Sequence, residues 1–171
     1  MGLFGFGKPN ILELKRKKDI NGLILALGDK KYPEIRREAI QALGKCGDER
    51  AVDPLVRALR DSDKLVCSLA ITALGDLAAY RAAGDLIPKL ADSDDGVRLA
   101  TAHALGKLGD VRALDPLVDA LRDRESGIRS AAAEALGKLG SSLAVAPLHT
   151  ALKDSSKDVR EAAAAALKKL L

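Results

Sequence analysis

The sequence predicts an all-α fold: a right-handed α–α superhelical solenoid of about five helical hairpins, preceded by a short capping helix. Of the 171 residues, 47% are hydrophobic but only 2% are aromatic, so the core must consist of Ala, Leu, Val and Ile. Such small aliphatic side chains suit close helix packing better than a β-sandwich or barrel. An Ala-Leu-Gly step also recurs every 31 residues, and apolar residues inside each interval follow helical spacing.

The 31-residue frame divides the chain into repeated units. The glycines that mark it are Gly44, Gly75, Gly106 and Gly137. Residues 1–18 form an N-terminal arm and capping helix, and residues 19–171 form the solenoid. Repeats 1 to 5 are expected at about 19–47, 48–78, 79–109, 110–140 and 141–171. One hairpin of this length cannot bury both of its apolar stripes, so neighbouring hairpins must stack.

An early proline marks the first helix of most repeats. In repeat 4, Asp115 and Pro116 are expected to be the N-cap and the first helical residue. In repeat 3 the proline comes three positions later, at Pro88. With Asp85 as N-cap, Pro88 would still lie in the first turn, where its missing N–H costs no hydrogen bond. We therefore expect a shifted start of this helix and no kink.

The second helix of each repeat is rich in small residues. In repeat 4 it includes the segment from Ile128 to Leu136, and a glycine past the helix end is expected to supply a left-handed cap. Small side chains allow neighbouring helices to approach closely. We therefore expect the second helices to line the concave side of the stack.

The capping helix, at about Asn10 to Lys18, carries the net charge of the chain. Residues 1–18 hold five basic residues and one acidic residue, whereas the remaining 153 residues hold 23 of each kind. Ile11 and Leu14 are expected to cover the apolar side of repeat 1. Phe4 and Phe6, which stand among glycines, are expected to be mobile unless they fold back on the stack.

The recurrent pattern Gly-Asp-x-Arg-Ala-x-x-Pro-Leu-x-x-Ala-Leu-x-Asp, followed by Val-Arg-x-x-Ala-Ala-x-Ala-Leu-Gly, resembles the short HEAT-like repeats first named from phycobilin lyases. The resemblance covers about 150 of the 171 residues, and repeats 2 and 4 match best. It implies an α-solenoid that binds partners on the face lined by the second helices. The superfamily consists mostly of interaction scaffolds and includes a few enzymes.

Outward positions of the second helices differ between repeats, whereas the buried Leu, Ala and Gly positions recur. Leucines lie in the middle of this set and charged residues toward its ends, which is typical of a recognition groove. The alternative is that the leucines pack against an adjacent second helix. The candidate partner-binding residues are Arg37, Gln41, Leu65, Leu69, Thr72, Asp76, Leu99, His103, Lys107, Glu134 and Lys138.

A second recurrent feature is an arginine directly after the Val or Ile of the second helix. It is present as Arg36, Arg98, Arg129 and Arg160, and Cys67 replaces it in repeat 2. An aspartate recurs in each hairpin turn, so we expect a structural ladder of guanidinium bonds to carboxylates or turn carbonyls between successive repeats. A phosphate-binding arginine row is the alternative, but an acid accompanies each arginine.

Groups that could perform catalysis or bind a metal do not converge in the sequence. Cys46 and Cys67 match no metal or redox motif and are expected to be reduced thiols of a cytoplasmic protein. His149 takes an apolar position of a first helix and is expected to be half-buried. His103 alone makes no metal site. No apolar run approaches the roughly 18 residues that a membrane helix needs.

The sequence therefore predicts a monomeric scaffold that has no catalytic activity and no cofactor. It is expected to bind a protein partner, of an identity that the sequence does not give, in the concave groove. The first alternative is a bilin lyase-like or chromophore-handling protein, although aromatic residues that could stack a tetrapyrrole are nearly absent. The second is nucleic-acid binding through a HEAT-like groove, as in DNA glycosylases with such repeats, which the neutral solenoid body disfavours.

Overall fold

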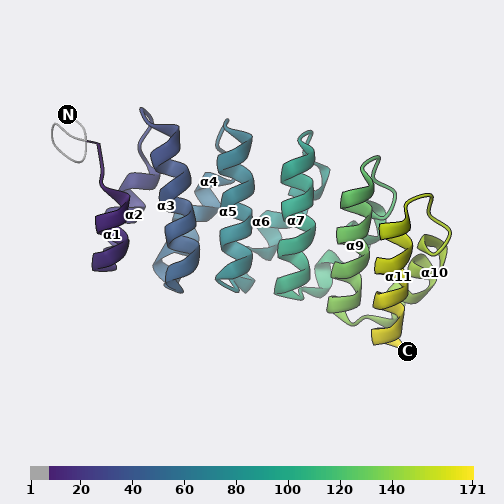
Figure 1. The fold of residues 1–171 in the computed structure, drawn as a ribbon. Helices are drawn as coiled ribbons and strands as arrows, with labels where there is room; N and C mark the ends of the chain where they lie inside the picture. The colour runs from purple at the N-terminus through teal and green to yellow at the C-terminus, as the bar shows by residue number, and fades with distance from the viewer. Residues whose placement is uncertain (1–7) are drawn as a thin grey trace. The chain divides into compact units, whose positions relative to one another are not determined.

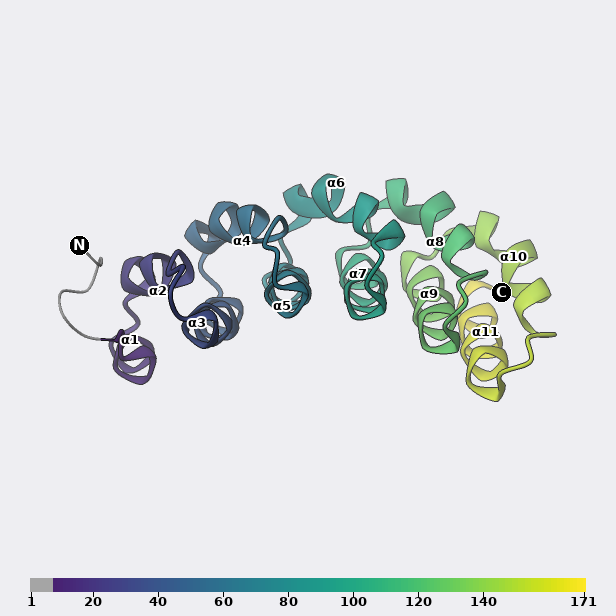
Figure 2. The ribbon, with the colours of Figure 1, turned by 90° about the horizontal axis from the view of Figure 1, so that it is seen from above.

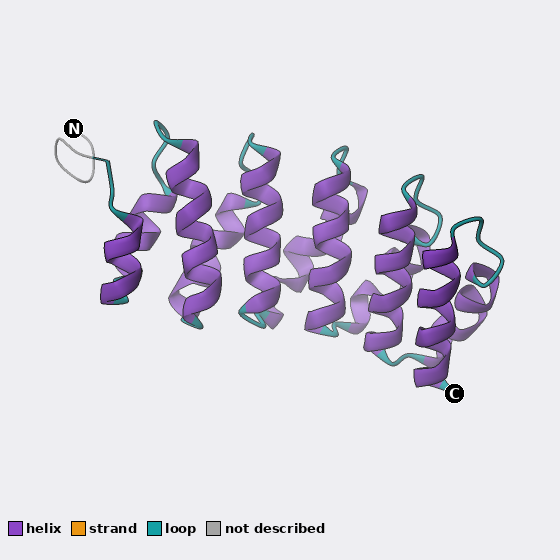
Figure 3. Ribbon diagram, in the orientation of Figure 1, coloured by secondary structure: helices purple, strands orange, loops and turns teal. Residues whose placement is uncertain are grey.

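The computed structural model describes residues 8–171, and in this range the chain consists of helices joined by short turns (Figures 1 and 3). Strands are absent from the described residues. The predicted class, an all-α solenoid of helical hairpins, is confirmed. Phe4 and Phe6 lie outside the described residues. The chain divides into two compact units, which meet in the sequence between Ala79 and Tyr80.

The N-terminal unit holds the capping helix and the hairpins of repeats 1 and 2. Its helices are α1 (Ile11–Lys17), α2 (Ile20–Leu27), α3 (Pro33–Cys46), the 3₁₀ turn η1 (Glu49–Ala51), α4 (Val52–Ala58) and α5 (Lys64–Asp76). Helices α2 and α3 form one hairpin, α4 and α5 form the next, and α3 packs along α5. In Figure 2, α2 and α4 lie in one row, and α1, α3 and α5 lie in another.

Helix α1 covers the start of repeat 1. The side chain of Asn10 caps it by accepting a hydrogen bond of 3.1 Å from the backbone N–H of Glu13. Ile11 is buried, as an apolar cap residue requires. A Cβ atom placed on Gly22 of α2 would lie 2.6 Å from Leu14 Cδ2. Leu14 can therefore pack against α2 only because residue 22 has no side chain.

The C-terminal unit holds repeats 3 to 5. Helices α7, α9 and α11 pack side by side in one row, with the shorter first helices in the other row (Figure 2). Its elements are η2 (Tyr80–Ala82), α6 (Ala83–Leu86), η3 (Ile87–Ala91), α7 (Asp95–Leu108), η4 (Val111–Ala113), α8 (Leu114–Ala120), α9 (Ser126–Leu139), η5 (Ser142–Ala144), α10 (Val145–Ala151) and α11 (Lys157–Leu170).

The first helices begin earlier than predicted. Asp115 and Pro116 are not the N-cap and first residue of α8, which starts at Leu114 and directly follows the 3₁₀ turn η4. The carboxylate of Asp110 caps this turn by accepting from the N–H of Arg112 at 2.9 Å. The helical segment therefore begins after Asp110, six residues before the proline. Pro116 then lies in the first turn of α8.

The prediction of a shifted helix start in repeat 3 is wrong. Asp85 lies inside α6, and the α-helical segment ends at Leu86. The chain continues as the 3₁₀ helix η3, in which Pro88 is the second residue. Because proline has no N–H to donate to the carbonyl four residues earlier, the α-helical pattern stops and a tighter helix replaces it.

Glycines within the second helices allow these helices to approach closely. A Cβ on Gly137 would lie 2.7 Å from Ala166 Cβ, and one on Gly106 would lie 2.9 Å from Ala135 Cα. No side chain fits at such distances, which explains why glycine recurs every 31 residues. The left-handed caps are supplied by a later set of glycines, Gly47, Gly109 and Gly140, whose φ angles lie between 64° and 75°.

Candidate partner-binding site

The predicted partner-binding residues of the N-terminal unit lie on α3 and α5. Gln41, Thr72 and Asp76 are exposed, Leu65 keeps 47% of its surface accessible, and Leu69 is half-buried. Leu12 and Leu25 of the same unit are also exposed, so this exposure alone does not distinguish Leu65. The role of Leu65 in partner binding stays a prediction.

Arg37 is less available for a partner than predicted, because it bridges α3 to the start of α5. Its Nη2 donates to Asp63 Oδ2 at 2.6 Å, and the side chain is half-buried. This hydrogen bond holds the pKa of the Asp63 carboxyl below its usual value. Asp63 also caps α5 through the N–H of Leu65 at 3.0 Å. Arg37 therefore has a structural contact in addition to any role in binding.

The predicted residues of the C-terminal unit lie on α7 and α9. His103, Lys107, Glu134 and Lys138 are exposed, and Leu99 is half-buried. The helices that carry them pack directly against their neighbours in the order α7, α9, α11. Their outward side chains therefore face solvent from one continuous helical layer within this unit.

A shallow depression of about 450 Å³ lies between α9 and α11. Its floor is formed by small residues, Ala162, Ala165 and Ala166. Glu134 and Lys138 border it from α9, and Asp158, Glu161 and Lys169 border it from α11. The acids of α11 lie near its N-terminus, whereas Lys138 and Lys169 lie near the helix C-termini. The depression therefore presents a negative end and a positive end around an apolar floor.

The structure brings Glu134 and Lys138 together beside one depression. It places Leu65, Leu69 and Thr72 in the N-terminal unit, and Leu99 and His103 in the C-terminal unit. The central apolar cluster proposed from the sequence, which takes residues from both units, stays a prediction.

The arginines expected to form a ladder do connect successive repeats in the C-terminal unit. Arg98 Nε donates to Asp123 Oδ2 at 2.8 Å, and its Nη1 donates to the Asp92 carbonyl at 2.9 Å. Arg129 repeats this geometry, with 2.8 Å from Nε to Asp154 Oδ2 and 2.8 Å from Nη1 to the Asp123 carbonyl. Each guanidinium therefore binds the turn of its own repeat and the carboxylate of the next one.

The remaining positions of the ladder differ. Arg36 binds Asp61 more loosely, with Nε 3.1 Å and Nη2 3.3 Å from the carboxylate oxygens. Arg160, in the last repeat, donates to the turn carbonyls of Asp154 and Ser155 at 2.7 and 2.9 Å. In repeat 2 the Cys67 thiol donates to the Leu59 carbonyl at 3.3 Å. The contribution of the ladder to stability stays a prediction.

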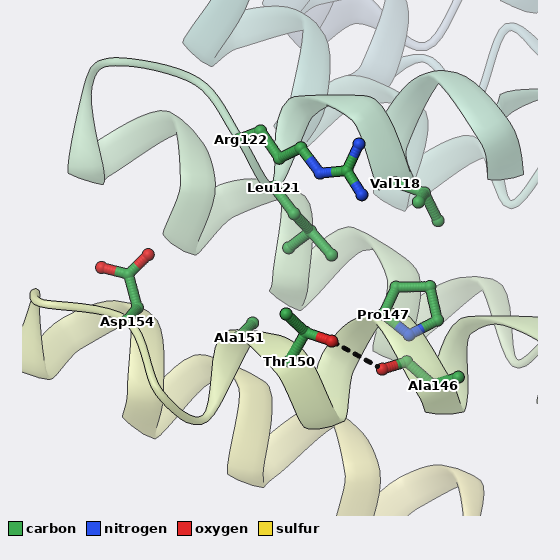
Figure 4. Close-up of a pocket in the computed structure, with 8 residues that line it drawn as sticks. All are labelled: Val118, Leu121, Arg122, Ala146, Pro147, Thr150, Ala151 and Asp154. Atoms are coloured by element: carbon green, nitrogen blue, oxygen red, sulfur yellow. Dashed lines mark hydrogen bonds between the residues drawn. The ribbon is translucent and has the colours of Figure 1, made fainter.

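Sequence reasoning missed clefts on the side of the first helices. One of about 360 Å³ lies between α8 and α10, and Figure 4 shows Arg122 on one wall with Pro147 and Asp154 on the other. Thr150 there donates to the Ala146 carbonyl at 3.3 Å. A cleft of about 590 Å³ occupies the equivalent position between α2 and α4. The first helices around the cleft between α8 and α10 are short, with seven residues each, against fourteen for α9 and α11.

The described residues contain no cluster of three His, Cys, Asp or Glu side chains that could hold a metal ion. His149 is exposed, so its predicted half-burial is wrong; its position on α10 turns toward solvent and not toward the core. Cys46 is exposed and Cys67 is buried, and neither forms a disulfide. Among the described helices, none is long and apolar enough to cross a membrane.

Stacked helical hairpins in a 31-residue frame define this chain as an α-solenoid repeat protein. The chain belongs to the HEAT-repeat family, since the sequence profile of HEAT repeats matches residues 20–87 and 83–168, which together make up most of its length. The resemblance seen in the sequence is thereby confirmed. Among curated proteins, no sequence matches the chain significantly.

Several solved structures share this fold. The complex of CpcE and CpcF of phycocyanin lyase from Nostoc sp. PCC7120 contains a chain with 28% sequence identity and a TM-score of 0.81. The match covers 88% of this chain and 64% of the lyase chain. A designed armadillo repeat protein in complex with the peptide (KR)4 gives 21% identity and a TM-score of 0.73, covering 97% and 87% of the two chains. At that identity the designed protein shows the fold alone.

Proposed function

We propose that this protein is a non-catalytic scaffold that holds a partner protein against the outward face of its second helices. The observation that carries the proposal is the depression between α9 and α11, where charged side chains of both signs surround a floor of alanines. A rim with charges of both signs would fix the orientation of a bound partner. The charged side chains at its rim are exposed, whereas Ala162 and Ala166 of the floor belong to the buried core.

Glu134 and Lys138 are the residues of α9 that we expect to contact the partner. Both are exposed, and they lie four residues apart on one side of the helix. A partner segment with a basic residue near Glu134 and an acidic residue near Lys138 would match this order of charges. Long-range attraction between such patches raises the association rate and fixes the orientation of the complex.

The test exchanges these two charges. The double variant Glu134→Lys/Lys138→Glu keeps the net charge, the helix-forming side chains and the pair of opposite charges. A matched control, Asp119→Lys/Arg122→Glu, exchanges two exposed charges of the same repeat at the first-helix side. Immobilised wild-type protein and both variants are compared for the proteins they retain from native cell extract.

We expect one or more proteins to be retained by the wild type and by the control but not by the α9 variant. Retention of the same proteins by all three forms would contradict the proposal. Circular dichroism must show equal helicity for the three forms, because both pairs of positions are exposed.

A second candidate function is association with another HEAT-repeat chain in a lyase-type assembly that handles a bilin. The observation that favours it is the 28% identity and TM-score of 0.81 to a chain of the CpcE–CpcF complex. Against it, the described residues offer only Tyr32 and Tyr80 as aromatic side chains, and neither borders the depression between α9 and α11.

Co-expression with a bilin-producing system separates the two candidates. A scaffold without chromophore chemistry is expected to purify without a visible absorption band. A band that stays with the protein through gel filtration would favour the lyase-type assembly and contradict a scaffold that has no chromophore.

A further inference from the structure

The cleft between α2 and α4 differs chemically from its counterpart between α8 and α10. Its floor is apolar, formed by Ile24, Leu27, Pro54 and Ala58. Its volume of about 590 Å³ lies within the range of roughly 300–1,000 Å³ that is typical of ligand pockets. At its edge Asp61 is bound by Arg36, with its Oδ2 3.1 Å from Arg36 Nε. This carboxylate is therefore neutralised by a cation of the protein itself.

Two further cations line this cleft, Lys30 from the turn after α2 and Arg57 from α4. Both side chains are exposed, and neither forms an ion pair or hydrogen bond with the described residues. Because the Arg36–Asp61 pair is internally balanced, the cleft carries the two positive charges of Lys30 and Arg57.

The cleft between α8 and α10 provides the comparison. Pro147, Ala151 and Asp154 line it at the positions that Pro54, Ala58 and Asp61 occupy between α2 and α4. The position of Arg57 is taken there by Thr150, and the lysine at the turn has no counterpart among the lining residues. The shape of the cleft thus recurs with the repeat, whereas the pair of cations does not.

We propose that the cleft between α2 and α4 binds an acidic segment of a partner protein, with an apolar side chain on the floor and flanking carboxylates at Lys30 and Arg57. Charge complementarity selects this occupant, because a guanidinium binds a carboxylate through two parallel hydrogen bonds and an ammonium adds a second contact. The apolar floor excludes water from the inserted side chain and adds affinity. The site lies away from the second-helix face and does not depend on the function proposed above.

The experiment uses the full-length protein labelled with ¹⁵N and the terminally blocked peptide Glu-Glu-Leu-Leu-Glu-Glu. Amide shifts are followed during titration of wild-type protein, of Lys30→Glu/Arg57→Glu, and of the matched control Arg122→Glu in the cleft between α8 and α10. A peptide with Gln in place of every Glu tests the role of the carboxylates. Because Lys30 and Arg57 are exposed, the double variant is expected to fold. If it does not fold, the milder single variant Arg57→Gln replaces it in the titration.

We expect the acidic peptide to shift amides of α2, α4 and the turns that follow them, and the affinity to fall about tenfold in the double variant and for the Gln peptide. The control variant should bind as the wild type does. The proposal is overturned if the peptide causes no shifts, if the shifts lie in the basic helix α1 instead, or if the double variant or the Gln peptide binds equally well. It is also overturned if inorganic phosphate alone produces the same shifts, since the site would then take small anions and no apolar side chain.

Discussion

Replacing Arg129 with Ala tests whether the arginine ladder holds successive repeats together. In the structure the guanidinium and the Asp154 carboxylate keep 14% of their side-chain surfaces accessible. Two hydrogen bonds of 2.8 and 2.9 Å join them, and a third of 2.8 Å joins the guanidinium to the Asp123 carbonyl. The substitution removes these three and a fourth, of 3.2 Å, to the Arg124 carbonyl. It leaves the Asp154 carboxylate with the N–H of Ser156 and the side chain of Ser155 as donors.

The expected cost lies between that of an exposed pair and that of a buried one. Exposed ion pairs contribute about 0–1 kcal/mol, and breaking a buried pair costs about 3–5 kcal/mol. For this mostly buried pair we expect about 2 kcal/mol, which corresponds to a fall of about 4–8 °C in Tm for a chain of this size. Thermal and urea unfolding followed by circular dichroism measure it.

Arg112→Ala is the matched control for this measurement. Arg112 also donates two hydrogen bonds to an aspartate, from Nε to Asp110 Oδ1 at 3.0 Å and from Nη2 to Asp110 Oδ2 at 2.6 Å. However, 63% of its side chain is exposed. We expect its unfolding midpoint to stay close to that of the wild type. Equal midpoints for Arg129→Ala and wild type, or equal losses for both variants, would refute the reasoning that burial gives the ladder its strength.

The same pair predicts a pH dependence. The hydrogen bond from Arg129 lowers the pKa of the Asp154 carboxyl below its ordinary value of about 3.9. A carboxyl with a lowered pKa in the folded state stabilises the fold above its unfolded pKa and loses this effect as the pH falls through the folded value. The difference in stability between wild type and Arg129→Ala should therefore be full near pH 6 and shrink below about pH 4.

Three further substitutions test the glycine positions. Gly137→Ala should destabilise the protein by about 1–3 kcal/mol, because the new Cβ would lie 2.8 Å from Ala166 Cα. In the same helix, a Cβ on Gly127 would have no other atom within 4 Å, so Gly127→Ala should stabilise the protein by about 0.5–1 kcal/mol. Urea denaturation measures both changes in stability. If both substitutions destabilised the protein, the close approach of α9 and α11 would not explain the effect of Gly137→Ala. Ala78 has a φ of 49° at the position where other repeats have a left-handed glycine, so Ala78→Gly should raise stability by about 1 kcal/mol. An unchanged or lower midpoint for Ala78→Gly would show that the alanine is not strained.

The fold could be predicted almost fully from the sequence, because the 31-residue repeat and the sizes of the side chains determine it. The 31-residue frame identifies the hairpins, and the contact of Gly137 with Ala166 shows why small residues recur. The starts of the first helices could not be predicted from Asp-Pro alone, since a 3₁₀ turn capped by Asp110 precedes α8. In the same way, the effect of Pro88 depends on where α6 begins, which sequence spacing leaves open.

The candidate site could be predicted less well. Exposure of His103, Glu134 and Lys138 follows from helical periodicity, and the structure agrees. Half-burial of Leu69 and Leu99 depends on neighbouring helices. Replacing these two leucines with Asp would therefore lower the stability of the fold as well as partner binding, and the two effects could not be separated. The clefts between first helices are lined by residues of two successive repeats, such as Arg122 and Thr150. This three-dimensional property has only an indirect signal in the sequence.

Photo-crosslinking from one row of equivalent positions tests the central claim most directly. His103, Glu134 and Ala165 occupy the same repeat position on α7, α9 and α11, and all three are exposed. A photoreactive amino acid at each of them, in native cell extract, is expected to give adducts that contain the same partner. The equivalent exposed positions Asp115 and Ala146 on the first helices should give no such adduct. A partner that crosslinks from Asp115 and Ala146 but not from the row on the second helices would contradict the proposed binding face.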